Sequence, residues 1–296
     1  MKDSLFSPGH ALCAGCGQSI AARILIDTSG PDTIIANATG CLEVSTSLFP
    51  TSSWEVPWIH SLFENTAAVA AGIEAALKYK GMLDDVKVIA QAGDGGTADI
   101  GLQALSGMWE RGHDVLYVCY DNSAYMNTGV QRSSLTPYGA STTTSPAGSH
   151  SVGNPLREKN MIKIAAAHYI PYAASASIGY PRDLRRKVKK ALSIRGPKYL
   201  HIFVPCPLGW RHEPRLSVKI GQLAVKTGVF PMVEYEYGEL TSVYKLKEVL
   251  QVEEYLKPQG RFSHLFDDSP EALEHIKKIQ GYADYNIKQY GLRKES

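Results

Sequence analysis

Asp94 and Asn122 are the residues of this sequence whose types and surroundings most directly suggest chemistry. Asp94 lies in the glycine-rich run Gly93–Gly96, and Asn122 ends the run Tyr120–Asn122. Carboxylate and amide oxygens are hard ligands of the kind that Mg²⁺ prefers, and glycines let a diphosphate approach the backbone closely. The two motifs predict a magnesium site beside a diphosphate site, provided that the fold brings them together.

The segments that precede Asp94 and Asn122 predict such a fold. Apolar runs over 86–91 and 115–120 predict buried strands that end just before the two motifs. The other expected elements are helices over 19–29, 65–80, 97–111, 160–169 and 181–194, strands over 33–37, 172–178 and 198–204, and loops over 48–59 and 123–159. This alternation predicts an α/β fold with a mostly parallel sheet and helices on both faces, and such sheets hold ligands beyond the carboxyl ends of their strands.

Residues 1–210 are expected to form this domain, and residues 211–296 to form a C-terminal extension. Beyond Trp210 the composition shifts toward Glu, Lys and Tyr, in a pattern that does not repeat the strand and helix alternation. We therefore expect the extension to pack on the domain or on a partner subunit, not to form a second catalytic domain.

Four of the five cysteines are placed to hold a metal centre. Cys13 and Cys16 precede the first helix with two residues between them, whereas Cys41 and Cys206 follow the first and last expected strands. Four thiolates at the edge that carries Asp94 suit a [4Fe–4S] cluster. The alternatives are a Zn²⁺ ion held by the same thiolates, or inert core positions for Cys41 and Cys206. Cys119 lies inside an apolar strand and is expected to belong to the core.

Composition and charge exclude few partners but favour an ordinary globular protein. Hydrophobic residues make up 44% of the chain, and the formal net charge is +2, so nothing indicates nucleic acid or membrane as a partner. No apolar run approaches the roughly 20 residues of a membrane span, and the N-terminus lacks the apolar core of a signal peptide, which predicts a cytoplasmic protein. A basic cluster is expected to be the solvated face of a helix or, alternatively, a patch for an acidic partner: Arg182, Arg185, Arg186, Lys187, Lys189 and Lys190.

These motifs together resemble the β subunits of 2-oxoacid:ferredoxin oxidoreductases, most closely those of pyruvate synthases. The segments that carry the resemblance are 8–16, 39–43, 54–60, 63–64, 93–101, 120–132 and 205–210. The resemblance implies a thiamine diphosphate-binding fold, with thiamine diphosphate, Mg²⁺ and a [4Fe–4S] cluster as cofactors and coenzyme A as a co-substrate.

The resemblance also implies roles for individual residues. The expected cluster ligands are Cys13, Cys16, Cys41 and Cys206, and the expected Mg²⁺ ligands are the side chains of Asp94 and Asn122 and the carbonyl of Ala124. The residues expected around thiamine diphosphate are Gln18, Cys41, Gly93, Asp94, Gly95, Gly96, Asn122, Ser123, Ala124, Tyr125, Met126 and Asn127. Asn127 matches a catalytic position near the substrate carboxylate. Gln18 falls where many pyruvate enzymes carry Glu, and its amide could still bond the aminopyrimidine.

The implied reaction is the oxidative decarboxylation of a 2-oxoacid to acyl-CoA and CO₂, with electrons passing to ferredoxin, or the reverse. The implied partners are an α subunit that supplies a Glu to the pyrimidine and part of the substrate pocket, γ and ferredoxin-like δ subunits, and ferredoxin. Within this chain Glu43, Glu55 and Glu64 are the alternative carboxylates, although Glu64 is expected to be a first-turn helix charge or an interface contact. Two other functions stay open: a non-redox thiamine-dependent decarboxylase half, and an iron–sulfur electron-transfer subunit without thiamine.

Overall fold

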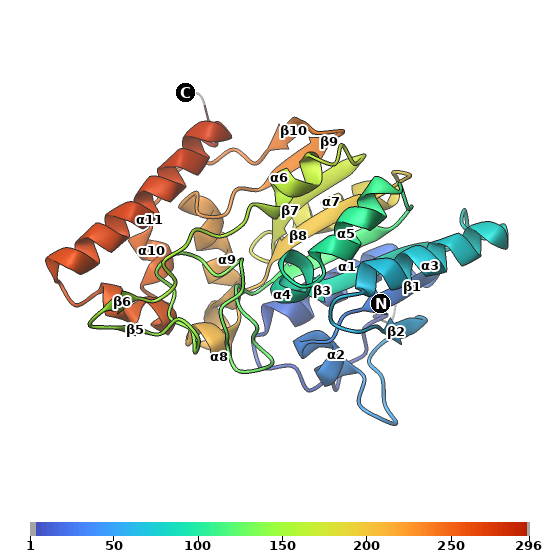
Figure 1. Ribbon diagram of the computed structural model, residues 1–296, viewed down its shortest axis with the longest axis horizontal. Helices are drawn as coiled ribbons and strands as arrows, with labels where there is room; N and C mark the ends of the chain where they lie inside the picture. The colour runs from blue at the N-terminus through green and yellow to red at the C-terminus, as the bar shows by residue number, and fades with distance from the viewer. Residues whose placement is uncertain (1–3, 295–296) are drawn as a thin grey trace.

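The computed structural model describes residues 4–294, which form an α/β fold around one eight-stranded sheet (Figure 1). The strand order is β10-β9-β7-β8-β4-β3-β1-β2. The strands are β1 Thr33–Asn37, β2 Trp58–His60, β3 Lys87–Gly93, β4 Leu116–Asp121, β7 Tyr172–Ser177, β8 Lys198–Phe203, β9 Val233–Glu236 and β10 Glu239–Val243. All neighbours from β7 to β2 run parallel, whereas β9 and β10 add an antiparallel edge. The predicted mostly parallel sheet is confirmed.

Helices cover both faces of this sheet, as predicted. On one face lie α1 (Gly17–Ser29) and α7 (Pro181–Leu192), and on the other lie α3 (Thr66–Tyr79), α5 (Leu102–Glu110) and α6 (Met161–Ala166). Neighbouring strand residues such as Val118 and Cys119 enter opposite cores, so the strands are apolar throughout rather than alternating. The side chain of Cys119 is fully buried, which confirms its expected place in the core. None of the helices within residues 4–294 combines the length and apolar character that crossing a membrane requires.

The helix expected over 97–111 is in fact two helices. They are α4 (Asp94–Ala98) and α5, with a break at Asp99–Gly101. The Asp99 carboxylate accepts hydrogen bonds from the hydroxyl of Tyr125 at 2.6 Å and the backbone N–H of Ser134 at 3.1 Å. Gly101 packs so closely on the carbonyl of Gly96 that any Cβ there would collide with it. The break leaves Asp94 at the start of its own short helix.

Local structure also differs from the expectation at 48–59 and 160–169. A short helix α2 (Cys41–Thr46) follows β1 directly, and the end of the expected loop joins the sheet as β2. Helix α6 covers less than the expected range. The Asn160 side chain caps its start by accepting from the N–H of Lys163, and the helix ends at Ala166, before Tyr169 adopts a left-handed φ of 53°. The long segment 123–159 holds only a small hairpin of β5 (Ala147–Gly148) and β6 (Ser151–Val152).

Residues 211–294 belong to the same sheet and to a third core. They follow α8 (Pro207–Trp210) and comprise η1 (Pro214–Leu216), α9 (Ser217–Lys226), β9, β10, α10 (Glu253–Leu256), η2 (Gly260–Leu265) and α11 (Pro270–Gln289). Strand β9 pairs with β7, and side chains of α9, α10, η2 and α11 surround Phe203 and Trp210. The C-terminal segment thus packs on its own chain, while the boundary at residue 210 stays a prediction.

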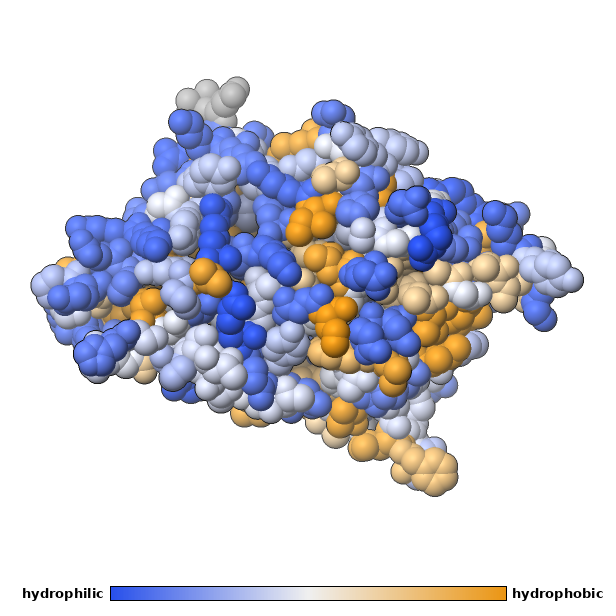
Figure 2. All heavy atoms as spheres, viewed as in Figure 1, coloured by the Kyte–Doolittle hydropathy of each residue, from blue (hydrophilic) through white to orange (hydrophobic). Residues whose placement is uncertain are grey.

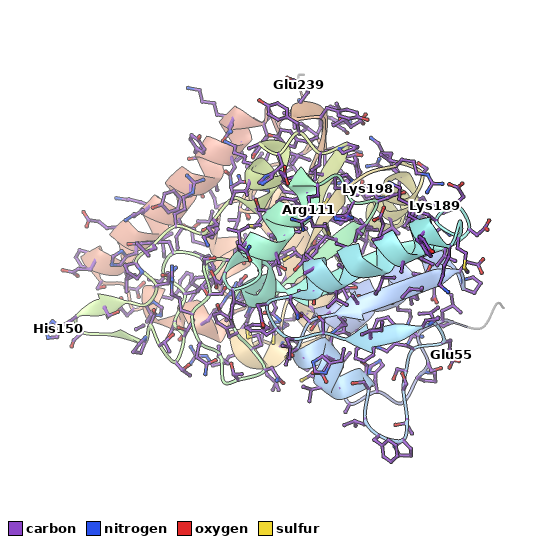
Figure 3. The ribbon with its side chains drawn as sticks, turned by 45° about the vertical axis from the view of Figure 1, so that its right-hand side comes forward. Glu55, Arg111, His150, Lys189, Lys198 and Glu239 are labelled. Atoms are coloured by element: carbon purple, nitrogen blue, oxygen red, sulfur yellow. The ribbon has the colours of Figure 1, made fainter. Side chains whose placement is uncertain are left out.

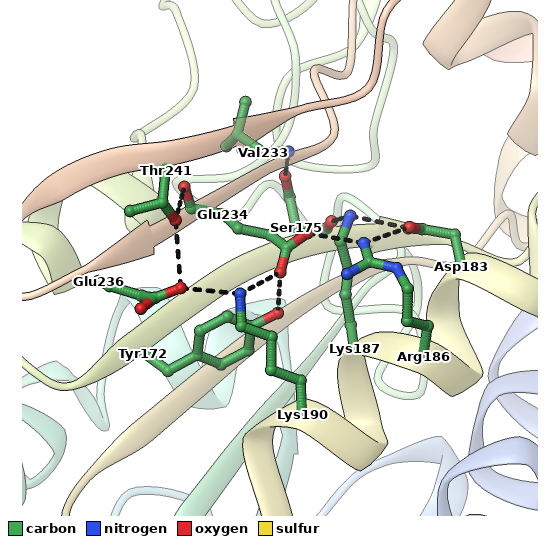
Figure 4. A network of polar contacts seen from close by, with 10 residues as sticks. All are labelled: Tyr172, Ser175, Asp183, Arg186, Lys187, Lys190, Val233, Glu234, Glu236 and Thr241. Carbon is green, nitrogen blue, oxygen red and sulfur yellow. Dashed lines mark hydrogen bonds and ion pairs between the residues drawn. The ribbon is translucent and has the colours of Figure 1, made fainter. Parts of the chain in front are cut away.

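The basic cluster on α7 is only partly a solvated face (Figure 4). Arg182, Arg185 and Lys189 are exposed as expected. Lys187 is 2% exposed and donates to Asp183 and to the carbonyl of Ser175, each at 2.7 Å, so the expectation is wrong for this residue.

Two more residues of the basic cluster, Arg186 and Lys190, form ion pairs with Glu234, which lies on β9. Glu234 is buried and binds Arg186 at 2.6 Å, Lys190 at 3.0 Å and the Tyr172 hydroxyl at 2.7 Å. Burial alone would raise the pKa of Glu234, but these hydrogen bonds outweigh it and lower that pKa to about 2. The network therefore ties α7 to the antiparallel edge of the sheet.

Replacing Glu234 with Gln is expected to lower the free energy of unfolding by about 1–3 kcal/mol at pH 7, because Arg186 and Lys190 lose their shared anion. Because the folded-state pKa is depressed, this contribution is complete above the ordinary pKa of 4.5 and is lost as the pH falls toward about 2. Urea unfolding at pH 7 and pH 3 measures it. The control is E236Q, which removes a 37% exposed carboxylate that pairs with Lys190 and accepts a long hydrogen bond from Thr241 at 3.4 Å, and it should cost less than about 0.5 kcal/mol. Equal losses in the two variants at pH 7 would contradict the prediction.

Candidate active site

The residues with candidate chemistry follow four parallel strands and meet at one edge of the sheet. Cys41 follows β1, Asp94 follows β3, Asn122 follows β4 and Cys206 follows β8. Strands β1 and β3 are neighbours in the sheet. After β1 the chain continues to β2 on the side away from β3, and after β3 it continues to β4 on the side away from β1, which opens a crevice between the carboxyl ends of β1 and β3. The predicted convergence on one edge is confirmed.

A cavity of about 220 Å³ occupies this crevice. The predicted residues that line it are Gln18, Cys41, Gly93, Asp94, Gly95, Gly96, Asn122, Ala124, Tyr125, Met126 and Asn127. Ser123 does not line it: this residue is buried, and its backbone N–H donates to Asp121 at 2.8 Å. Asn37, Thr39 and Phe63 also line the cavity, although none of them was expected there; Thr39 and Phe63 lie in segments that carry the resemblance.

Three oxygen-bearing groups converge at the Asp94 end of the cavity. The terminal atom of the Asn122 carboxamide that faces Asp94 lies 3.0 Å from Oδ1 of Asp94 and 2.8 Å from the carbonyl oxygen of Ala124. With its nitrogen in this place, the carboxamide donates to both oxygens. With its oxygen there, that oxygen lies about 3 Å from each of the other two, which is the spacing of adjacent ligands of an octahedral Mg²⁺, whose Mg–O distances are about 2.0–2.1 Å. The donor set fits magnesium.

The Asp94 carboxylate is 2% exposed and lies at the first position of α4. Burial raises the pKa of Asp94 well above its ordinary value, and the nearby charge of Asp121 adds to the shift. The hydroxyl of Ser133 donates to Oδ2 of Asp94 and opposes the shift. Ser133 lies in the first third of the 123–159 segment, directly after the motif at 120–132, and was not expected at this site. A divalent cation would hold this buried carboxyl group in its ionised form.

Gly93 and Gly95 of the GDGG run differ in the space that a Cβ would have at each position. A Cβ on Gly93 would have no atom within 4 Å and would project into open space. A Cβ on Gly95 would instead collide with the ring of Tyr125, whose hydroxyl is held by Asp99. The close approach at Gly95 is therefore made by an aromatic ring of this chain.

The four predicted cysteine ligands line a second cavity of about 230 Å³. They are Cys13, Cys16, Cys41 and Cys206. This cavity shares Gln18, Cys41, Asn122, Met126 and Asn127 with the first, so the two cavities are neighbours. Among residues 4–294, no group of three or more His, Cys, Asp or Glu side chains is arranged to hold a metal ion.

Close backbone contacts bring the Cys13–Cys16 loop to Cys206. The N–H of Gly17 donates to the carbonyl of Pro205 at 3.1 Å, and a Cβ on Gly17 would lie only 2.8 Å from that oxygen. On the other side of the loop, the hydroxyl of Ser217 donates to the carbonyl of Gly15 at 2.5 Å. Glycine is required at position 17 because only a bare backbone lets the two segments approach this closely.

The thiols lie at the beginnings of helices, where backbone N–H groups can stabilise an anionic sulfur. Cys16 precedes α1, Cys41 is the first residue of α2, and Cys206 caps α8 by accepting from the N–H of Gly209 at 3.4 Å. Burial, with a smaller contribution from the neighbouring thiols, nevertheless raises the pKa of Cys41 to about 12. Burial likewise raises the pKa of Cys206 to about 11. A bound metal centre would be needed to hold these groups as thiolates at neutral pH.

Helix α8 connects the two cavities through Trp210. The indole N–H donates to the backbone carbonyl of Asn122 at 2.7 Å, and the backbone N–H donates to the carbonyl of Cys206 at 2.9 Å. Gly209 packs against the sulfur of Met126 with no room for a Cβ. Trp210 is part of a motif noted in the sequence, but its role in positioning Asn122 is visible only in the structure.

Gln18 is one of the polar side chains that line both cavities. It is 5% exposed, and its Oε1 has no hydrogen-bond partner among the described residues. An unpaired buried amide oxygen is costly, so a group that binds in the cavity could satisfy it.

The glutamates considered from the sequence do not line either cavity. Glu43 lies 3.6 Å from Nδ1 of His60, and Glu55 lies on the loop beside β2, at the margin of the molecule (Figure 3). Glu64 precedes Asn65, the N-cap of α3, so its expected place in the first helical turn is wrong. An interface role for Glu64 stays a prediction.

Comparisons with known proteins agree with this geometry. Residues 38–202 match the family model described as "Thiamine pyrophosphate enzyme, C-terminal TPP binding domain". Pyruvate synthase subunit PorB of Methanosarcina barkeri is 58% identical over 285 residues, which cover 96% of each chain. The protein of the same name from Methanocaldococcus jannaschii is 56% identical over 98% of each chain. The chain belongs to the β subunits of the 2-oxoacid:ferredoxin oxidoreductases.

As a member of this family, the β subunit is a catalytic subunit of a multi-subunit oxidoreductase that acts on 2-oxoacids, and it has the thiamine diphosphate-binding fold. Ketoisovalerate oxidoreductase subunit VorB of Pyrococcus furiosus is also similar, with 47% identity over 91% of this chain and 88% of that protein. A solved 2-oxoglutarate:ferredoxin oxidoreductase from Magnetococcus marinus has the same fold, with a TM-score of 0.59, 21% identity and coverage of 75% of this chain and 79% of that one.

Proposed function

We propose that this β subunit binds Mg²⁺ and thiamine diphosphate in the first cavity and a [4Fe–4S] cluster in the second, and that its substrate is pyruvate. The reaction would convert pyruvate and coenzyme A to acetyl-CoA and CO₂ with electrons passing to ferredoxin, or run in reverse. The observation that supports this most is the shared wall of the two cavities, formed by Gln18, Cys41 and Asn122 among others. Pyruvate is proposed because relatives at 58% and 56% identity are named pyruvate synthase subunits.

The thiamine side of the proposal rests on the donor set and on Gln18. Asp94, Asn122 and the carbonyl of Ala124 would hold Mg²⁺, which in turn would anchor the diphosphate near Gly93. The unpaired Oε1 of Gln18 would accept a hydrogen bond from the aminopyrimidine. Asn127, an exposed residue at the cavity rim, would face the substrate carboxylate. When bound, thiamine diphosphate supplies the electron sink that decarboxylation of a 2-oxoacid requires.

The choice of a cluster over zinc rests on the shape of the thiol site. A structural Zn²⁺ needs four ligands within about 2.3 Å of one point. The thiols of this chain instead surround a cavity of about 230 Å³, with Cys13 exposed and the other three half-buried. A multi-atom centre suits that arrangement better than a single ion. The four thiols would stay reduced in the cytoplasm, where we place the protein.

The α subunit is proposed because the described part of the first cavity lacks a free carboxylate for the pyrimidine. Glu43, Glu55 and Glu64 lie outside the cavity. A partner has a surface to bind: apolar side chains gather around α2, β2 and the start of α3 (Figure 2). The exposed apolar residues of this region are Val44, Leu48, Phe49, Ile59 and Leu62, with Phe49 98% exposed. Such a patch is typical of a subunit interface. The γ, δ and ferredoxin partners are part of the same proposal.

Anaerobic purification of the isolated chain and of the assembled complex tests the proposed function. We expect the chain alone to show no 2-oxoacid-dependent reduction of a viologen dye, because it lacks the partner carboxylate. The complex should contain iron and should reduce the dye only with both pyruvate and coenzyme A. Activity in the isolated chain would contradict the requirement for a partner.

The same preparations distinguish the other two functions. A complex that binds thiamine diphosphate with Mg²⁺ but contains no iron would be a non-redox decarboxylase. A complex that contains iron but does not bind thiamine diphosphate would be an electron-transfer assembly. A complex that is active with another 2-oxoacid but not with pyruvate would correct the substrate alone.

A further inference from the structure

Arg261 is a buried cation with no ion-pair partner among the residues that the structure describes. Its side chain is 2% exposed, and it donates to Oε1 of Gln259 at 3.0 Å and to the hydroxyl of Tyr255 at 3.1 Å, both neutral groups. Within residues 4–294, no carboxylate lies within ion-pair distance of this guanidinium. A buried unpaired charge is expensive, so its presence calls for a compensating anion.

Two other buried cations of the chain are each paired with a carboxylate. Lys187 pairs with Asp183 at 2.7 Å, and Lys198, which is 4% exposed, pairs with Asp114. Both lie away from the candidate active site. Arg261 differs from them in lacking a carboxylate and in packing on α8, the helix whose N-cap Cys206 lines the thiol cavity.

The contacts of Arg261 connect it to helix α8. The guanidinium carbon lies 3.8 Å from the centre of the Trp210 ring, and α8 begins at the Cys206 cap. The N–H of the neighbouring Gly260 donates to the carbonyl of Arg211 at 3.0 Å, which fixes η2 against the end of α8. Stacking on an aromatic face is a favourable way to hold a desolvated guanidinium.

The groups that act electrostatically on Arg261 include a thiol of the cavity. Burial lowers the pKa of Arg261, whereas the negative forms of Tyr255, Asp121 and Cys206 raise it. The hydroxyl of Tyr255 is protonated at neutral pH because burial raises its pKa. Asp121 is already bonded to Nε2 of His201 at 2.9 Å and to Ser123. Of these three groups, Cys206 is the one whose charge would change when the thiol cavity binds a metal centre.

We propose that Arg261 is the built-in counter-charge of the iron–sulfur centre and raises its reduction potential. The inference rests on the proposed function, because the thiol cavity acquires negative charge only when its cysteines bind the cluster as thiolates. A [4Fe–4S] centre with four thiolates is anionic, and it gains a further negative charge on reduction. A fixed cation nearby favours the reduced state, so its removal lowers the potential.

The test is a redox titration of the assembled holoenzyme, monitored by electron paramagnetic resonance. The neutral variants R261Q and R261M should reduce the equilibrium constant for reduction by about tenfold, which is a shift of about 59 mV to a lower potential for a one-electron couple. R261K keeps the charge and should stay close to the wild-type potential. The matched control is R215Q, which removes an 81% exposed guanidinium that is paired with Glu213 and should have little effect.

Each outcome decides the inference. The inference would be overturned by unchanged potentials in both neutral variants or by an equal shift in R215Q. It would also be overturned if R261K had the same defect as the neutral variants, because the defect would then come from lost packing and not from lost charge. If the neutral variants fold by circular dichroism but lack the electron paramagnetic resonance signal of the cluster that C206S removes, while R261K shows it, the counter-charge is supported. A wild-type holoenzyme without iron would instead refute the proposed function.

Discussion

Replacing Asp94 with Asn is expected to weaken the binding of thiamine diphosphate with Mg²⁺ by about 100-fold or more. The change removes the one negative charge among the three oxygen donors, while the side chain keeps its shape at the start of α4. Isothermal titration of the assembled complex with thiamine diphosphate in excess Mg²⁺ measures the loss. Turnover with pyruvate should fall at least as far.

The same variant separates binding from folding. The pKa of Asp94 is raised in the folded chain, so this group lowers the stability of the fold progressively as the pH rises above its ordinary pKa of 3.8. D94N without cofactor should consequently unfold at the same urea concentration as the wild type or at a higher one. The matched control D85N removes an exposed carboxylate just before β3 and should leave binding unchanged. Cofactor affinity in D94N within threefold of the wild type would show that Asp94 is not an anchor.

Replacing Cys206 with Ser is expected to lower the iron content of the complex by the one cluster that this subunit holds and to lower dye reduction by about 100-fold or more. A serine hydroxyl is a poor ligand for the cluster, but serine is a good N-cap. It should preserve α8, and with it the hydrogen bond from Trp210 to Asn122. Thiamine diphosphate affinity should therefore stay within a few-fold of the wild type. Iron analysis and titration of the same preparation measure both quantities.

The chain offers a matched control for the loss of one thiol. Cys119 is buried in β4 and lies in the core rather than in either cavity. C119A should keep its full iron content, although it leaves a small void. Iron loss in C119A equal to that in C206S would show that the cluster responds to general destabilisation, and unchanged iron in C206S would remove Cys206 from the ligands.

The sequence was sufficient to predict where the site lies. Apolar runs of strand length precede Asp94 and Asn122, and strands joined through helices form parallel sheets whose carboxyl ends share an edge. Cys41 and Cys206 come after strands in the same way, so they were expected at that edge too. Connectivity alone imposes this arrangement, because it depends on the order of elements and not on their packing.

The tertiary structure decided what holds these residues in place. Ser133 reaches Asp94 across 39 positions, and Trp210 reaches Asn122 across 88. The basic residues of α7 predicted a solvated helix face, because the carboxylate that pairs with two of them, Glu234, lies 48 residues after Arg186 and is not evident from the helix sequence. Arg261 becomes notable only once its burial and its lack of a carboxylate are known. Such contacts depend on how distant segments pack, and neither periodicity nor motif spacing records that packing.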